Sequence, residues 1–126
     1  MNADELIALL RLEPHPKEGG YFRETYRSSA SSEPGPPFDG FRSHGTAIYY
    51  LLTPETFSAM HRLPGDEVFH FYLGDPVEML ELHPDGSTRT ITLGSDPRTM
   101  QLQHVVHGGV WQGSRLVEGG KWALMG

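Results

Sequence analysis

Two side chains able to handle protons or bind a metal ion lie close together between residues 60 and 74. His61 precedes a Pro64–Gly65 turn by three residues, and Glu67 follows two residues after the turn. Because a tight turn joins neighbouring antiparallel strands, this spacing predicts an imidazole and a carboxylate near the start of two adjacent strands. An imidazole changes charge near neutral pH, so His61 is a candidate general base. Glu67 is then the candidate group that fixes its tautomer.

Strand alternation decides which side chains share the interior with this pair. Successive residues of a strand point to opposite faces. On the first strand, one face carries Phe57, Ala59, His61 and Leu63. On the next strand, one face carries Glu67, Phe69, Phe71 and Leu73, and both faces are expected to point inward. His70 falls on the opposite face and is not expected to act with His61. A buried His–Glu pair must be hydrogen-bonded, and it serves either as a structural link between strands or as a functional site.

Other polar side chains are candidates for the same site. Gln112 follows a Gly108–Gly109 turn and alternates with Val110 and Ser114, which points it toward the same interior. Arg23 is a candidate partner for a substrate carboxylate or phosphate, or for a surface ion pair with Glu24. The candidate proton donors are Tyr21, Tyr49, Tyr50 and Tyr72. The candidate substrate contacts are Tyr21, Arg23, Tyr50 and Gln112.

Many short strands with regular turns must position these residues. Residues 3–12 predict one short helix, because Leu6, Leu9 and Leu10 share a helical stripe. Ser28–Gly40, rich in Ser, Pro and Gly, predicts a surface loop, and His83–Ser87 contains the Asp-Gly pair of a tight hairpin. Strands are expected over 21–27, 45–53, 57–63, 67–73, 77–83, 88–93, 100–106, 110–117 and 121–125. An all-β sandwich or barrel is the expected fold.

Composition restricts the protein's class. A chain of 126 residues predicts a single domain, residues 1–126, with a real hydrophobic core. The balance of 10 basic and 16 acidic side chains, without a basic cluster, argues against nucleic acid as a partner. There are no cysteines, no signal-peptide pattern at the N-terminus and no membrane-spanning apolar run. We therefore expect a cytoplasmic protein that does not act on nucleic acid or in a membrane.

The spacing of these residues resembles the two motifs of the cupins. The first motif, G-x5-H-x-H-x3,4-E-x6-G, is matched by His61, Glu67 and Gly74, with Leu63 in the place of the second histidine. The second motif, G-x5-P-x-G-x2-H-x3-N, is matched by Gly109, with Gln112 in the place of the last metal ligand. The resemblance implies a double-stranded β-helix, the cupin jelly-roll barrel, with one short N-terminal helix.

Further segments resemble one subfamily, the largely uncharacterised cupin-5 type. They are Glu18–Ser28, Thr46–Leu52, Asp66–Glu67 and Gly108–Gln112, and the resemblance runs from about residue 6 to the last residue. It implies assembly as a homodimer. Members usually continue beyond the Trp-Ala-Leu strand into a Pro-Gly-Phe segment, whereas the sequence here ends at Gly126.

The replaced ligands leave three functional hypotheses open. Metal-binding cupins usually present three histidines and a glutamate, so His61, Glu67 and Gln112 form a poor metal site. No cofactor is the first expectation, and a divalent metal ion in a cupin lyase or oxygenase is the alternative. Metal-free epimerising cupins use a histidine base and a tyrosine acid, which favours an isomerase-like or epimerase-like enzyme acting on a sugar-like or small carboxylated metabolite. A non-catalytic metabolite-binding module is the third hypothesis.

Overall fold

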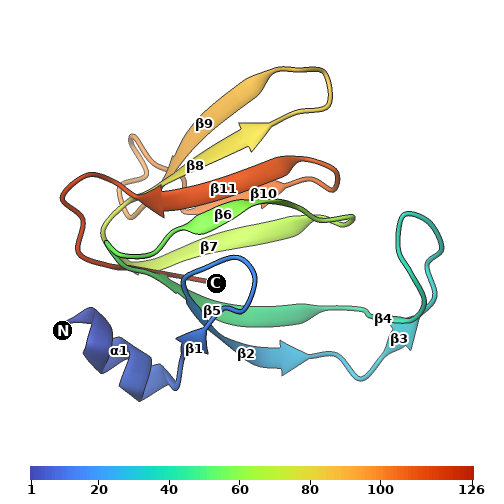
Figure 1. Cartoon of the computed structure of the whole chain (residues 1–126), viewed down its shortest axis with the longest axis horizontal. Helices are drawn as coiled ribbons and strands as arrows, with labels where there is room; N and C mark the ends of the chain where they lie inside the picture. Colours follow the sequence, from blue (N-terminus) through green and yellow to red (C-terminus); the bar gives the residue numbers. More distant parts are fainter.

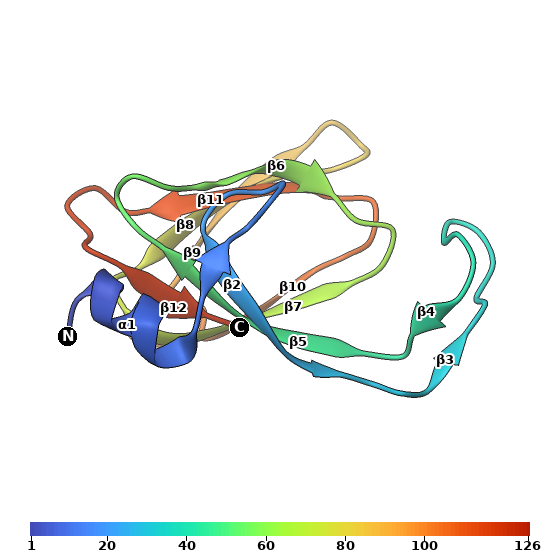
Figure 2. The same ribbon diagram turned by 60° about the horizontal axis from the view of Figure 1, so that its bottom comes forward.

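The computed structural model describes residues 1–126 as one helix and twelve strands. Two larger sheets face each other as layers, and a short pair of strands projects to one side (Figures 1 and 2). The elements are α1 (Ala3–Leu10), β1 (Glu13–Pro14), β2 (Tyr21–Arg27), β3 (Ser31–Ser32), β4 (Arg42–Ser43), β5 (Thr46–Leu52), β6 (Ser58–Arg62), β7 (Glu67–Gly74), β8 (Val77–Leu82), β9 (Thr88–Leu93), β10 (Gln103–Val106), β11 (Trp111–Leu116) and β12 (Ala123–Met125).

The larger sheet has the strand order β1-β2-β5-β12-β7-β10, and the smaller has the order β6-β11-β8-β9. No strand pairing joins the two sheets, so both keep free edges. The prediction of a mainly β fold with one short N-terminal helix is confirmed. The structure contains no helix with the length and apolar character needed to span a membrane.

Alternation along β2 and β5 gives the larger sheet two different faces. Phe22 lies opposite Tyr50 in the register, and both pack into the core between the sheets. Tyr21 lies opposite Leu51, and this pair packs on the outer side with Leu6 of α1. The helix therefore covers the outer face of the larger sheet, as Figure 2 shows.

The main core lies between the two sheets and draws on both. Its fully buried members include Leu52 and Met125 from the larger sheet and Val77 and Met79 from the smaller one. Burying a side chain of this size contributes about 1.5–3 kcal/mol to stability. This layer of apolar side chains holds the sheets at the spacing across which the polar site is built.

The predicted hairpin at His83–Ser87 is confirmed. The His83 N–H donates to the Ser87 carbonyl at 2.9 Å, and Gly86 has a φ of +87°, a conformation that glycine adopts without strain. The Asp85 carboxylate accepts the Ser87 N–H at 2.9 Å. The turn joins β8 to β9 and fixes the register of the smaller sheet.

Three local expectations differ from the structure. Leu73 does not share a face with Phe71, because a bulge in β7 pairs Leu73 with Leu124 and Phe71 with Met125, which leaves one extra residue between them. The strands of His61 and Glu67, expected to be adjacent partners, lie in different sheets, because β6 belongs to the smaller sheet and β7 to the larger one. The loop Ser28–Gly40 includes β3, whose pairing with β4 forms the projecting arm in Figure 1.

Candidate functional site

Three polar side chains form a row across the inner face of the smaller sheet. Gln112 of β11 lies directly opposite His61 of β6 on one side and Glu81 of β8 on the other. Residues directly opposite each other in antiparallel strands share a face. The expectation that Gln112 points toward the same interior as His61 is confirmed.

Each member of this row faces a polar partner beyond the smaller sheet. His61 faces Glu18, in the turn between β1 and β2, with 3.6 Å between His61 Nε2 and Glu18 Oε1. The Gln112 amide donates to Glu67 Oε1 at 2.9 Å. His104 of β10 approaches Glu81, with 2.8 Å between Nε2 and Oε2. Three polar bridges thus cross the space between the sheets.

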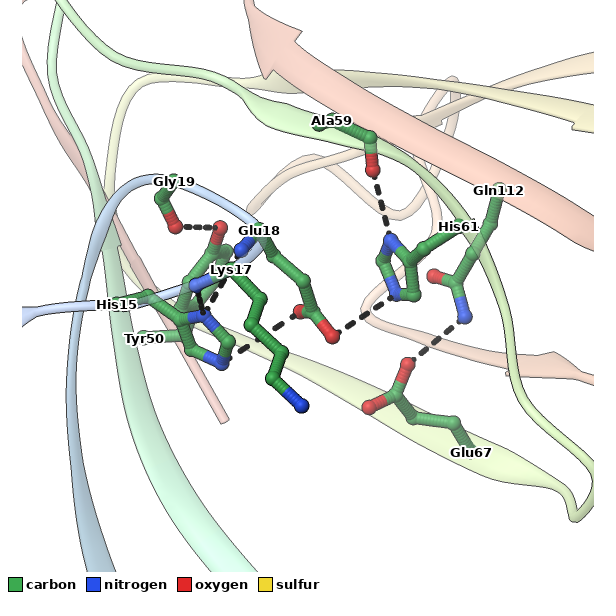
Figure 3. A network of polar contacts seen from close by, with 9 residues as sticks. All are labelled: His15, Lys17, Glu18, Gly19, Tyr50, Ala59, His61, Glu67 and Gln112. Carbon is green, nitrogen blue, oxygen red and sulfur yellow. Dashed lines mark hydrogen bonds and ion pairs between the residues drawn. The ribbon is translucent and has the colours of Figure 1, made fainter.

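The hydrogen bond of His61 fixes which ring nitrogen is free. Its Nδ1 lies 2.7 Å from the carbonyl oxygen of Ala59. A carbonyl only accepts, so Nδ1 must carry the proton, and Nε2 of the neutral ring then has a lone pair. Nε2 is the only buried side-chain nitrogen or oxygen without a hydrogen-bond partner. Figure 3 shows it directed toward Glu18.

The turn from His15 to Gly20 holds Glu18 in place beside His61. The Ala59 N–H donates to the Glu18 carbonyl at 2.7 Å, and the Tyr50 hydroxyl donates to the Gly19 carbonyl at 2.6 Å. His15 Nδ1 accepts the N–H of Glu18 at 3.0 Å, so the neutral His15 ring carries its proton on Nε2, 3.8 Å from Glu18 Oε2. The Glu18 carboxylate therefore lies between two imidazoles (Figure 3).

Glu67 lies in this cluster but does not orient His61, contrary to the expectation. Its bonded partner is Gln112, and His61 is oriented by the Ala59 carbonyl. Burial raises the pKa of Glu67, and the negative charge of Glu18 adds to this rise, while the hydrogen bond from Gln112 opposes it. Glu67 thus keeps its proton to a higher pH than an exposed glutamate.

Tyr50 is the candidate tyrosine that the structure brings to the cluster. Burial raises the pKa of Tyr50 to about 12, so its hydroxyl stays protonated and serves as a donor to the 15–20 turn. Tyr49 and Tyr72 contact each other with ring centroids 6.1 Å apart. Tyr49 packs on the outer face with the helix cluster.

Tyr21 and Arg23, two expected substrate contacts, lie on that same outer face. Tyr21 packs beside the Leu6 cluster under the helix. Arg23 lies opposite Tyr49 in the register, donates from Nε to the Leu10 carbonyl at 2.6 Å, and stacks over the Tyr49 ring at 5.8 Å. Alternation along β2 turns both side chains away from His61, so the structure does not bring them to the site.

Two functional candidates were missed by sequence reasoning, Glu18 and Glu81. Glu18 lies in a turn far from His61 in the sequence, and only the packing of that turn against β6 brings them together. Glu81 is 2% exposed and also contacts His83, at 3.1 Å. Its alternation with the apolar Met79 along β8 could have predicted that Glu81 points inward.

The donor set does not fit the metal site of metal-binding cupins. No group of three or more His, Cys, Asp or Glu side chains is arranged to hold a metal ion. Of the three expected ligands, Glu67 and Gln112 are bonded to each other, and His61 offers one nitrogen. Leu63 in the place of a histidine explains why the set remains incomplete.

Two hollows open away from the His61 cluster. One, of about 720 Å³, is bounded by Met60, Leu80 and Gly113, which alternate with inward residues of the smaller sheet. The other, of about 560 Å³, lies beside α1 and is lined by apolar side chains. The side chains of His61 and Glu18 are 17% and 28% exposed, so the edge of the cluster meets solvent although His61 Nε2 itself is buried.

Two facing antiparallel sheets, with His61 on the edge strand β6 opposite Gln112 on β11, are consistent with a cupin-like protein. A family model described as "Cupin superfamily (DUF985)", Cupin_5, matches residues 4–126. The chain belongs to this family, which confirms the resemblance drawn from the sequence.

Known relatives share the sequence and the fold. The uncharacterised protein YML079W of Saccharomyces cerevisiae is 32% identical over 110 residues, covering 80% of this chain and 55% of that protein. The chain thus spans about half the length of this curated relative. Protein SO0799 from Shewanella oneidensis has a similar structure, with a TM-score of 0.87, 33% identity and coverage of 99% of this chain and 75% of that one. A hypothetical protein from Leishmania major matches with a TM-score of 0.89, 31% identity and coverage of 99% and 78%.

Proposed function

We propose that this protein binds a small molecule and acts as an isomerase or epimerase in which His61 is the general base, without a metal cofactor. The substrate class is a sugar-like or small carboxylated metabolite with a carbonyl group. The observation that carries the proposal is the buried, unpartnered Nε2 of His61, whose lone pair is fixed by the bond from Nδ1–H to Ala59. A polar atom kept unsatisfied inside a protein costs stability and is often retained for function.

Glu18 supports the same role for His61. When Nε2 takes a proton, the ring becomes positive, and the Glu18 carboxylate 3.6 Å away stabilises that charge. The carboxylate also stands in front of Nε2, so a substrate reaches this nitrogen when the Glu18 side chain turns aside. Its partial exposure leaves room for that rotation.

Glu67 is the proposed proton donor. His61 Nε2 takes a proton from the carbon next to the carbonyl, the electron pair of that C–H bond forms the enol double bond, and the carbonyl oxygen takes a proton from the Glu67 carboxyl. In isomerisation, protonated His61 donates to the neighbouring carbon of the enediol while the hydroxyl on the first carbon returns a proton to the Glu67 carboxylate. In epimerisation, water donates a proton to the original carbon on its other face, the enol hydroxyl returns its proton to Glu67, and His61 releases its proton to the solvent. A raised pKa suits Glu67 to this task, whereas a Tyr50 pKa of about 12 makes Tyr50 a poor donor.

Family membership supports two further proposals. One is that the facing sheets are the halves of a cupin jelly roll, and the other is that the protein works as a homodimer. Sedimentation of the purified protein would test the second, since a monomer at working concentration contradicts it.

Hydrogen–deuterium exchange tests the catalytic proposal even while the product is unidentified. A panel of small aldoses, ketoses and keto acids is incubated with the protein in D₂O, and proton NMR follows the C–H signal next to the carbonyl. We expect loss of that signal for at least one compound, and loss of catalysis in His61→Ala. His70→Ala is the matched control, because His70 belongs to the next strand and stacks on Tyr72.

The outcomes separate the hypotheses. General-base positioning contributes about 10²–10⁴-fold, so His61→Ala should slow exchange at least a hundredfold while His70→Ala leaves it unchanged. A compound that binds the wild type without any exchange would make the protein a binding module and overturn the catalytic proposal. Equal exchange by His61→Ala and the wild type would remove His61 from the reaction.

A further inference from the structure

The His61 cluster contains two hydrogen-bond acceptors that have no donor, His61 Nε2 and the Glu18 carboxylate, whereas the proposed function assigns the proton of Glu67 to the substrate carbonyl. His61 Nε2 has a lone pair and no partner. The Glu18 carboxylate faces His15 and His61 at 3.8 and 3.6 Å, beyond hydrogen-bond distance. The Gln112 amide is already bonded to Glu67. A ligand that satisfies these groups must therefore bring donors of its own.

The charges around the cluster also disfavour an anionic ligand. Glu18 and Glu67 are near enough that the charge of Glu18 helps to raise the pKa of Glu67. No arginine or lysine forms an ion pair with Glu18, and the Arg23 and Arg62 side chains are engaged elsewhere, with Leu10 and with the Trp111 ring at 5.2 Å. A second anion brought to this place would be repelled.

Lys17 and Arg89 belong to the turn and the strand next to the cluster, but neither forms an ion pair with it. Lys17, on the 15–20 turn, uses its backbone N–H to donate to His15, and its side chain is exposed. Arg89 lies opposite Glu81 on the edge strand β9 and is also exposed. Both side chains are exposed, so neither supplies a buried cation of the kind that strengthens binding of a carboxylate or phosphate.

We infer that the ligand of the His61 cluster is a donor-rich, uncharged or cationic molecule, such as a polyhydroxylated carbonyl compound or its amino derivative, and not a carboxylate or phosphate. This inference rests on the proposed function and narrows its substrate class. Adjacent hydroxyl groups, or a hydroxyl beside an ammonium, would donate to the Glu18 carboxylate and leave the lone pair of His61 Nε2 for the C–H proton.

Matched sugars that differ only in charge test the inference. The probes are hexoses, their 2-amino derivatives and the corresponding uronic acids, with binding measured by calorimetry and by thermal stabilisation of the whole protein. We expect a neutral or amino form to bind at least tenfold more tightly than the uronic acid of the same ring. Tighter binding of a uronic acid, or no binding by any neutral or amino form, would overturn the inference.

A variant without the Glu18 charge tests whether this residue causes the preference for neutral or amino ligands over uronic acids. Glu18→Gln is expected to weaken binding of the amino form by about tenfold and to reduce discrimination against the uronic acid. Glu33→Gln is the matched control, because it makes the same change in net charge next to β3 on the projecting arm. An identical loss in both variants would overturn the assignment to Glu18.

The inference and the proposed function fail in different ways. Donor-rich ligands that bind without deuterium exchange would contradict catalysis and leave the ligand class intact. Exchange that depends on His61 but occurs with an anionic substrate would contradict the ligand class and leave the catalytic role intact.

Discussion

Replacement of Glu81 by Ala is expected to destabilise the folded protein strongly. The Glu81 side chain is 3% exposed and lies 2.8 Å from His104 Nε2 and 3.1 Å from His83 Nε2. Truncation leaves His104, whose side chain is 10% exposed, without its acceptor between the sheets. Leaving a buried polar group without its partner costs about 1–3 kcal/mol, and because Glu81 serves two histidines we expect a loss near the upper end of this range from the free energy of unfolding.

Glu78→Ala is the matched control for this experiment. Glu78 belongs to the same strand, and its ion pair with Arg115 spans 3.4 Å, but the two side chains are 43% and 74% exposed. An exposed pair contributes about 0–1 kcal/mol. Urea unfolding followed by tryptophan fluorescence would measure both variants against the wild type.

A double replacement separates the lost pair from the lost volume. Glu81→Met with His104→Leu replaces both partners by apolar side chains of similar size, and such exchanges are often neutral or stabilising. We therefore expect the double variant to regain most of the stability lost by Glu81→Ala. If Glu81→Ala costs no more than Glu78→Ala, the reasoning that this bridge links the two sheets is wrong.

Two further variants test the 15–20 turn and Glu67. Gly19→Ala is expected to cost more than roughly 1 kcal/mol in urea unfolding, because Gly19 has a φ of +92° and a Cβ would collide with the Phe57 carbonyl oxygen. Gly35→Ala is its control, with a φ of +82° and no neighbour within 4 Å, and an equal cost would contradict the steric explanation. Because the pKa of Glu67 is raised from 4.5, the folded state holds this proton longer than the unfolded chain, and wild-type stability falls as the pH rises through the folded pKa. Glu67→Gln should remove this fall in a pH series of urea unfolding, and a pH dependence identical to that of the wild type would contradict the role of burial.

Local sequence patterns predicted most of the strands, the short helix and the role of His61 as the central histidine of the site. They did not predict its carboxylate partner. The orientation of Gln112 toward the same interior as His61 follows from strand alternation and turn positions, which the sequence displays directly. The hairpin at His83–Ser87 follows from the preference of Asp-Gly for a tight turn. These features depend on neighbours in the chain.

Features that depend on distant contacts were not predicted. The bulge that moves Leu73 away from Phe71 arises from pairing with β12, which no pattern within β7 reveals. The partner of His61 proved to be Glu18, because the 15–20 turn packs on β6 through the bond from Ala59 to Glu18. The sequence did not show that Arg23 is unavailable to a substrate, because its bond to the Leu10 carbonyl depends on the packing of α1 against the outer face of the sheet.

The protonation state of the His61 ring tests the central claim most directly. Long-range ¹H–¹⁵N NMR of the protein, with His61 assigned by comparison with His61→Ala, distinguishes a protonated from an unprotonated ring nitrogen. We expect Nδ1 to carry the proton and Nε2 to be unprotonated in the neutral ring, as the 2.7 Å contact with the Ala59 carbonyl requires. A neutral His61 with its proton on Nε2 would contradict the assignment of this nitrogen as the general base.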